Sequence, residues 1–241
     1  MERGLYIAAS GMVAGQIRQD QIANDLANVS TTGYKADRSA QRSFGDVLLE
    51  EAGTGNAIGS LSLGTEIAEI RTDFTPAPLK QTDQPLDVAI DGVGFLAVQT
   101  AAGTRYTRNG QLALTADSTL VGAGGDPVLG TDGKPIRITG KGNVEIAADG
   151  TVSAGGQAQG KLAVVTLADA AKQGSSLFTG TPGAAPAATA VRQGFLETSG
   201  VNTARTMIEM IASMRAYESN QRVIRAIDET LSRGIQIAQP I

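Results

Sequence analysis

Residues 201–235 contain no proline and no glycine before Gly234, and this stretch limits the possible folds more than any other part of the chain. Its apolar side chains recur at intervals of three, four or seven, which is the periodicity of an α-helix. They are Met207, Ile211, Met214, Tyr217, Ile224, Leu231 and Ile235. Asn202 stands where its side chain can accept a hydrogen bond from the first turn. The predicted helix is roughly 50 Å long, and its narrow apolar stripe needs a second helix to cover it.

The only other long helical pattern lies at the opposite end of the chain, in residues 3–29. Its apolar side is formed by Leu5, Ala8, Ala9, Met12, Ile22, Leu26 and Val29. Gly11 and Gly15 weaken an isolated helix, but small residues let two helices approach closely. We therefore expect the two terminal helices to pair antiparallel as a coiled coil. Because both stripes are thin, we expect neighbouring copies of the chain to complete their burial.

The middle of the chain has the pattern of short strands. In residues 85–167, apolar residues alternate with polar ones and are interrupted by pairs such as Asn109-Gly110 and Asp149-Gly150, which favour tight hairpins. The predicted fold class is α+β, with terminal helices at 1–35 and 200–241 and a central all-β domain at 81–199, a small barrel or sandwich. Residues 36–80, which include Thr75-Pro-Ala-Pro78, are expected to form an extended connector.

Composition excludes several kinds of chemistry. The chain of 241 residues has no cysteine and no histidine, so thiol nucleophiles, disulfides, Cys/His zinc sites and imidazole catalysis are all absent. The net charge of −4 does not favour a nucleic-acid partner. No apolar run is long enough to span a membrane, and the N-terminus lacks the pattern of a cleaved signal peptide.

Three candidate sites are better explained by local structure. Gly92-Val-Gly94-Phe-Leu-Ala97 fits a loose nucleotide-binding pattern, but the residues after it alternate like a strand instead of opening a helix. Asp132-Gly133 and Asp149-Gly150 lack the clustered oxygen ligands of calcium loops. Tyr106, Arg108 and Asn109, with Asp87 or Asp91, are interpreted as a turn stabilised by side-chain hydrogen bonds, because no nucleophile–base pair is visible. We therefore expect no catalytic residue, metal site or cofactor.

Five segments resemble the bacterial flagellar rod and hook family. They are Ile22-Ala-Asn24-Asp-Leu26-Ala-Asn28-Val-Ser-Thr-Thr32-Gly33-Tyr34-Lys35, Gln84 to Phe95, Arg105-Tyr-Thr-Arg-Asn-Gly110, Gly194 to Asn202, and Met214-Arg-Ala-Tyr-Glu218. These segments are spread along the whole chain. The opening Met1-Glu-Arg-Gly-Leu-Tyr-Ile and the compact length are most similar to the proximal-rod type of basal-body rod protein. Asp25 and Gly200 depart from the residues usual in the family at those positions.

The resemblance implies a structural subunit that polymerises helically with itself and other rod subunits. It implies passage through the flagellar export apparatus without a cleaved signal, a place in the basal-body rod that crosses the periplasm, and no enzyme activity, nucleic acid or small-molecule substrate. The residues expected at the assembly interface are Leu5, Met12, Ile22, Leu26, Val29, Met207, Ile211, Met214, Tyr217, Ile224 and Leu231. The family-motif residues are Asn24, Asn28, Thr32, Gly33, Tyr34, Lys35, Asn109, Gly110, Asn202, Arg215, Tyr217 and Glu218.

Two alternatives stay open at this point. A distal-rod or hook-like subunit would share the same architecture, and counting copies and axial position in purified basal bodies would separate it. A cell-surface binding module with a coiled-coil stalk would form stable dimers or trimers in solution. An enzyme would need a polar pocket with an acid, base or nucleophile set, which the sequence does not offer.

Overall fold

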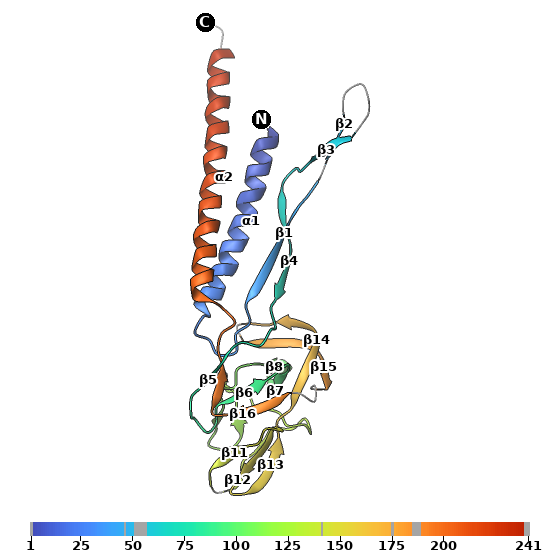
Figure 1. Ribbon diagram of the computed structural model, residues 1–241, viewed down its shortest axis with the longest axis vertical. Coiled ribbons are helices and arrows are strands. Elements are labelled where there is room, and N and C mark those ends of the chain that lie inside the picture. Colours follow the sequence, from blue (N-terminus) through green and yellow to red (C-terminus); the bar gives the residue numbers. More distant parts are fainter. Residues whose placement is uncertain are drawn as a thin grey trace. The chain divides into compact units, whose positions relative to one another are not determined.

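Two terminal helices and a series of short strands make up the chain, which confirms the predicted α+β class with a central β domain. The computed structural model describes residues 2–45, 47–50, 57–140, 142–174, 176–184 and 189–238. It divides into two units. The first contains Met1–Ala27, Asp37–Arg71 and Thr203–Ile241, and the second contains Asn28–Ala36 and Thr72–Asn202. The helices and the first four strands belong to the first unit, and the remaining strands to the second (Figure 1).

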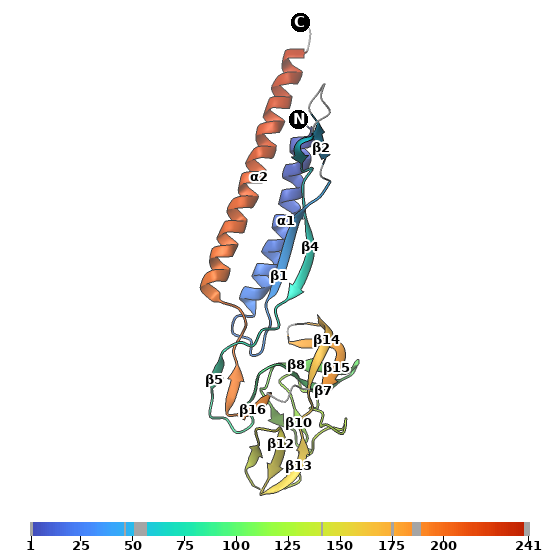
Figure 2. The same ribbon diagram turned by 45° about the vertical axis from the view of Figure 1, so that its right-hand side comes forward.

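In the first unit, helices α1 (Glu2–Ala27) and α2 (Thr203–Ala238) lie side by side and run in opposite directions (Figures 1 and 2). Gly4 of α1 faces Ile227, whereas Gly15 faces Tyr217. A Cβ atom on Gly11 would lie 2.8 Å from Asn220 Nδ2, and Ser213 Oγ donates a hydrogen bond to the Gly15 carbonyl. Small residues on α1 therefore allow the helices to approach closely.

The face of α2 that is least exposed differs from the predicted one in its first half. Its positions follow alternating steps of four and three, which is the spacing of a two-helix seam. They are Thr206, Met210, Ser213, Tyr217, Asn220, Ile224 and Ile227. Tyr217 and Ile224 belong to the predicted stripe, but Met207, Ile211 and Met214 are exposed. Apolar periodicity missed part of this face because Asn220 and Ser213, which lie beside Gly11 and Gly15 of α1, are polar.

The connector contains two strand pairs. Strand β1 (Asp37–Ser43) pairs with β4 (Thr65–Thr72), and β2 (Val47–Glu50) pairs with β3 (Ala57–Leu61). Side chains of α1 bind this segment, because Asp25 Oδ1 accepts from the Asp37 amide, Gln21 Nε2 donates to the Asp37 carbonyl, and Ser10 Oγ accepts from the Thr65 amide. The sequence of β1 is polar and lacks alternation, so its ordering depends on β4 and α1 instead of a buried apolar face.

The second unit is built from thirteen short strands among the described residues. They are β5 (Leu79–Gln81), β6 (Val88–Asp91), β7 (Phe95–Thr100), β8 (Gly103–Thr107), β9 (Ala113–Leu114), β10 (Leu120–Val121), β11 (Val144–Ile146), β12 (Thr151–Ala154), β13 (Gln157–Lys161), β14 (Val164–Lys172), β15 (Leu177–Ala184), β16 (Ala190–Gln193) and β17 (Phe195–Glu197). Strands β14, β15, β8 and β7 form a closed barrel, and β11, β12 and β13 form a sheet. Strand β16 pairs with β6, β17 with β5, and β10 with β9.

Two apolar clusters form the core of this unit. The larger one contains Val88, Ile90, Leu96, Val98, Leu120 and Val128, all at most 4% exposed. The smaller one is aromatic, with the rings of Phe74, Phe95 and Phe178 in mutual contact at centroid distances of 5.3–5.7 Å. Gly92 and Gly94 lead into strand β7 and not into a helix, as the alternation predicted. This core supplies the fixed support against which the motif segments pack.

Candidate functional site

The terminal helices expose most of the large apolar side chains that the described part of the chain shows to solvent. Eleven of fifteen such side chains lie on the helices, so these surfaces, and not the β unit, are the candidates for contact with a partner. On α1 they are Leu5, Tyr6, Ile7, Val13 and Ile17, and on α2 they are Met207, Ile208, Ile211, Met214, Val223 and Leu231.

Four of these residues form one surface at the start of α2. Met207, Ile208, Ile211 and Met214 are 49–67% exposed and spaced one, three and three residues apart, and we call them the α2 patch. The same side of the helix continues with charged residues, namely Arg215, Glu218, Arg222 and Arg225. An apolar patch bounded by charges has the composition of a protein contact surface.

The predicted interface residues are distributed over three environments. Leu5, Met207, Ile211, Met214 and Leu231 are exposed; Met12, Leu26, Val29, Tyr217 and Ile224 are half-buried; and Ile22 is buried within the chain. Tyr6, Val13 and Ile208 are exposed apolar residues that the sequence analysis missed. Tyr6 and Val13 are seven residues apart, as on one face of a helix. The next position at this spacing is Asp20, whose charge interrupts the apolar pattern.

The segment that follows α1 carries buried motif residues although it has no regular secondary structure. Gly33, Tyr34 and Lys35 are all buried, with Tyr34 and Lys35 at 0% exposure. The Gly33 amide donates to the Glu197 carbonyl at 2.9 Å. The Lys172 ammonium lies 3.9 Å from the centre of the Tyr34 ring, a cation–π contact, and donates to the Lys35 carbonyl. The Gly-Tyr-Lys motif is thus packed into the second unit.

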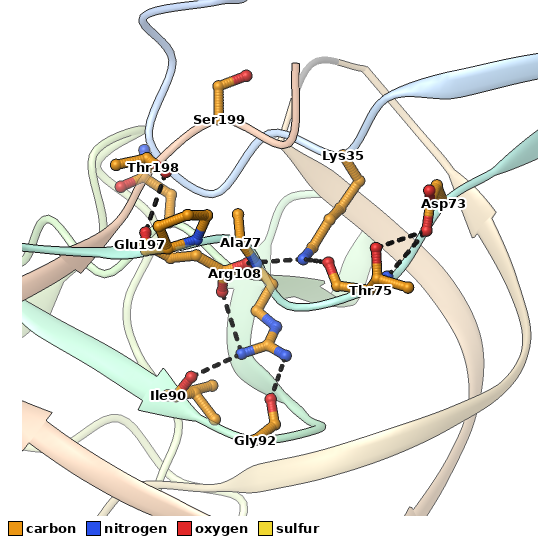
Figure 3. A network of polar contacts seen from close by, with 12 residues as sticks. Lys35, Asp73, Thr75, Ala77, Ile90, Gly92, Arg108, Glu197, Thr198 and Ser199 are labelled. Atoms are coloured by element: carbon orange, nitrogen blue, oxygen red, sulfur yellow. Dashed lines mark hydrogen bonds and ion pairs between the residues drawn. The ribbon is translucent and has the colours of Figure 1, made fainter. Parts of the chain in front are cut away.

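Lys35 forms a buried ion pair with Glu197 (Figure 3). The Lys35 Nζ atom lies 2.6 Å from Glu197 Oε1, and both side chains are at most 1% exposed. Lys35 Nζ also donates to the Thr75 carbonyl at 2.7 Å, and Glu197 Oε1 also accepts from the Ala77 amide at 2.9 Å. A buried ion pair is stable only when further hydrogen bonds satisfy its atoms, and this pair has them on both partners.

Arg108 is the second cation of the same cluster. Its Nη1 atom lies 3.1 Å from Glu197 Oε2 and donates to the Ile90 carbonyl, while Nη2 donates to the Gly92 carbonyl (Figure 3). The guanidinium also lies over the Phe95 ring at 5.6 Å. Together, Lys35, Glu197 and Arg108 form what we call the buried ion network, with two cations and one carboxylate. Sequence analysis missed this network because its partners are far apart in the chain, and it interpreted Arg108 as part of a turn.

Burial lowers the pKa of Lys35 below its usual value of 10.5, and the nearby Arg108 charge adds to this, while Glu197 acts in the opposite direction. Between the folded-state pKa and 10.5 the unfolded chain binds more protons than the folded chain. The unfolding free energy should therefore increase as pH rises towards 10.5. Urea denaturation from neutral pH upwards measures this increase. Lys35→Met should remove it, and a variant with the same slope as the parent chain would contradict the assignment.

Gly33 has a backbone conformation that other residues rarely adopt, with φ of +67°, and it also lacks space for a side chain. A Cβ atom there would lie 2.4 Å from the Arg108 carbonyl carbon. Gly133 has a similar φ of +73° with nothing within 4 Å of its Cβ position, so it is a matched control. We expect Gly133→Ala to cost about 1–2 kcal/mol of unfolding free energy and Gly33→Ala at least about 2 kcal/mol more. Equal losses in chemical denaturation would show that the contact with Arg108 does not matter.

The other motif residues fall into two groups. Asn109 Oδ1 accepts from the Gln111 amide, so this side chain stabilises the local backbone as predicted. The predicted hairpin at Asn109-Gly110 is wrong, because β8 pairs with β7 and β15 and β9 pairs with β10. A Cβ atom on Gly110 would clash with the Val88 carbonyl oxygen. The Asn28 carbonyl accepts from Ser199 Oγ, and Thr32 is half-buried. Asn24, Arg215, Tyr217 and Glu218 lie on the helices, and Asn202 directly precedes α2. The structure thus brings Gly33 and Asn109 together but not the whole motif set.

The described residues were considered for metal-binding and membrane-spanning features. They contain no group of three or more acidic side chains placed to hold a metal ion. Neither helix, over its described length, is long and apolar enough to cross a membrane.

Comparison with known proteins gives matches along nearly the whole chain. The flagellar basal-body rod protein FlgG of Bacillus subtilis is 34% identical over 98% of this chain and 99% of its own length. The chain belongs to the flagellar basal-body rod protein family. The FlgF rod protein of Escherichia coli is 32% identical over 98% of both chains, and the flagellar hook-basal body complex protein FlhO of Bacillus subtilis is 33% identical over 97% of both.

Three family models of the rod proteins match separate segments. Residues 5–35 match the flagella basal body rod protein model, 89–154 the flagellar hook protein FlgE/F/G D1 domain, and 192–237 the C-terminal model of the FlgEFG rod proteins. Lys35, Arg108 and Glu197 fall one in each of these segments. The buried ion network therefore joins the three parts of the chain that the rod protein family models describe.

Proposed function

We propose that this chain is a structural subunit of the flagellar basal-body rod, in its proximal part. It polymerises helically through α1 and α2, which wind as an antiparallel coiled coil, and so helps to build the shaft that transmits motor torque to the hook and filament. The observation that carries the proposal is the exposed apolar surface on both terminal helices of a chain related to rod proteins along its whole length. Its partners are copies of itself and other rod subunits.

The intrachain packing supports a partner on the outer faces of the helices. In the seam between α1 and α2, Asn220 lies beside Gly11 and Ser213 donates to the Gly15 carbonyl, so small and polar residues interrupt its apolar packing at these positions. Helices gain most of their stability in proteins from burying an apolar face. The α2 patch offers such a face, and a neighbouring subunit would supply its cover. Assembly thus stabilises helices that are weakly held in the free chain.

The position along the rod and the route to it are further parts of the proposal. The similarity of the N-terminal residues to proximal-rod proteins favours the proximal rod. Export through the flagellar apparatus, without a cleaved signal peptide, is part of the same proposal. The relatives include both FlgG and FlgF rod proteins and a hook-basal body complex protein, which favours a distal-rod or hook-like position as the second candidate. Copy number and axial position in purified basal bodies separate the two.

Limited proteolysis of the free chain, followed by mass spectrometry, tests the proposed weak ordering of the helices. We expect rapid cleavage within α1 and α2 and slow cleavage of the second unit, because loosely held segments open more often. The same cleavage sites should be protected in isolated basal bodies. If the terminal helices resist the protease to the same degree as the β unit, they are stable within a single chain. The coupling of helix order to assembly would then be rejected.

A further inference from the structure

Two segments of the second unit adjoin the terminal helices and are hydrogen-bonded to each other. Residues 28–36 follow α1, and residues 198–202 connect β17 to α2. The Gly33 amide donates to the Glu197 carbonyl and the Gly200 amide to the Tyr34 carbonyl, both at 2.9 Å. These contacts bring the chain that leaves α1 beside the chain that enters α2, but the first segment belongs to no sheet.

The buried ion network attaches both segments to the β core. Lys35 belongs to the segment after α1 and Glu197 ends β17, whereas Arg108 directly follows β8 in the β core. Arg108 donates to the carbonyls of Ile90 and Gly92, at the end of β6. The three side chains therefore come from three different segments of the chain, and Glu197 contacts both cations.

Ion pairs specify geometry more strictly than apolar contacts do. A protein in which apolar side chains replace a buried ion network is often as stable as the parent protein. The network is therefore better explained by the relative positions that it imposes on its segments than by a gain in stability. Here hydrogen bonds to the Thr75 carbonyl, the Ala77 amide and the Ile90 carbonyl fix the direction of each of the three charged groups, although Arg108 Nε and Glu197 Oε2 are buried without a hydrogen-bond partner among the described residues. At 0–1% exposure these side chains have no surface to offer a second subunit.

We propose that Lys35, Glu197 and Arg108 form a positional latch. The latch fixes the segment that follows α1 and the segment that precedes α2 to the β core. Lys35, Glu197 and Arg108 would then act as positioning residues for assembly, although they contact no other subunit. This role rests on the proposed rod function. In the free chain the latch holds segments 28–36 and 198–202 together even while the terminal helices open.

Hydrogen exchange of the free, full-length chain tests the latch at individual amides. In Lys35→Met, the amides of Gly33 and Gly200 should exchange at least 10-fold faster than in the parent chain, because both report contact between the two segments. The amides of Leu120 and Ile136, which donate within the core, should change less than 2-fold. Lys161→Met is the matched control, since Lys161 pairs with Asp149 at the surface, and it should leave all four amides unchanged.

Arg108→Lys is a second variant in case Lys35→Met does not fold. It keeps the charge but loses the forked donor set that reaches Ile90 and Gly92, and the same two amides should respond. Unchanged exchange at Gly33 and Gly200 would overturn the latch. A uniform increase that includes Leu120 and Ile136 would also overturn it, because the network would then contribute only to global stability.

A separate measurement connects the latch to assembly. Incorporation of the Lys35→Met chain into basal bodies should fall at least 10-fold, while Lys161→Met chains incorporate normally. Normal incorporation of a chain whose Gly33 and Gly200 amides exchange faster would overturn the assembly role. Absence of the parent chain from basal bodies would instead overturn the proposed function, and the exchange result on the free chain would be unaffected by it.

Discussion

Replacing Met214 with glutamate is expected to lower incorporation into basal bodies at least about 100-fold and to abolish motility. Met214 is 49% exposed in the α2 patch, so the free chain tolerates the new charge. If a neighbouring subunit covers the patch, the variant loses about 1.5–3 kcal/mol from burial of the methionine side chain in each subunit and buries an unpaired carboxylate as well. Quantitative immunoblotting of purified basal bodies and a swimming assay measure the effect.

Ser219→Glu is the matched control for this prediction. Ser219 is exposed on the same helix but lies outside the α2 patch, so the variant adds the same charge at a polar position. We expect it to assemble normally, and both variants should keep the circular dichroism and denaturation midpoint of the β unit. A motile Met214→Glu strain with normal basal bodies would show that the α2 patch is not an assembly surface.

Glu197→Gln is expected to cause a large loss of stability in the second unit. It removes the single carboxylate of the buried ion network and leaves Lys35 and Arg108 as two neighbouring buried cations. Removing one partner of a buried pair typically costs about 3–5 kcal/mol. Chemical denaturation followed by β-sheet circular dichroism measures this loss.

The substitutions in the buried ion network should differ in how much stability they cost. Lys35→Met should cost less than Glu197→Gln, because Glu197 and Arg108 then remain as a balanced pair. Asp91→Asn is the control, since Asp91 pairs with Arg192 at the surface and its loss should cost at most about 1 kcal/mol. If Glu197→Gln is no more destabilising than Asp91→Asn, the network does not hold the second unit together.

The sequence was most informative about the helices as elements and least informative about their faces. Period and the absence of glycine and proline located α2 to within a few residues, because both features act locally along the chain. The seam was misplaced at Met207, Ile211 and Met214 because apolar periodicity assumes that the most apolar face is the buried one. Here the polar residues Asn220 and Ser213 lie beside Gly11 and Gly15 of α1, whereas Met207, Ile211 and Met214 stay exposed.

The buried ion network was beyond sequence analysis for a different reason. Lys35 and Glu197 are separated by 162 residues, and no spacing rule connects them. Charged residues are almost never fully buried unless they are paired, so the default expectation for each was a solvated surface position. Only the motif resemblance marked their segments as special, and it did not say that they meet. Strand β1 was missed because its stability comes from β4 and α1, and not from its own pattern.

The most direct test of the assembly account uses the absence of cysteine from the chain, since an introduced cysteine is then the only thiol. Ile211→Cys in the α2 patch and Lys134→Cys on the exposed β surface should both react with a maleimide in the free chain. In isolated basal bodies we expect Ile211→Cys to be labelled at least 10-fold more slowly than in the free chain, while Lys134→Cys remains reactive. Equal labelling of Ile211→Cys in the free chain and in basal bodies would contradict the assembly account.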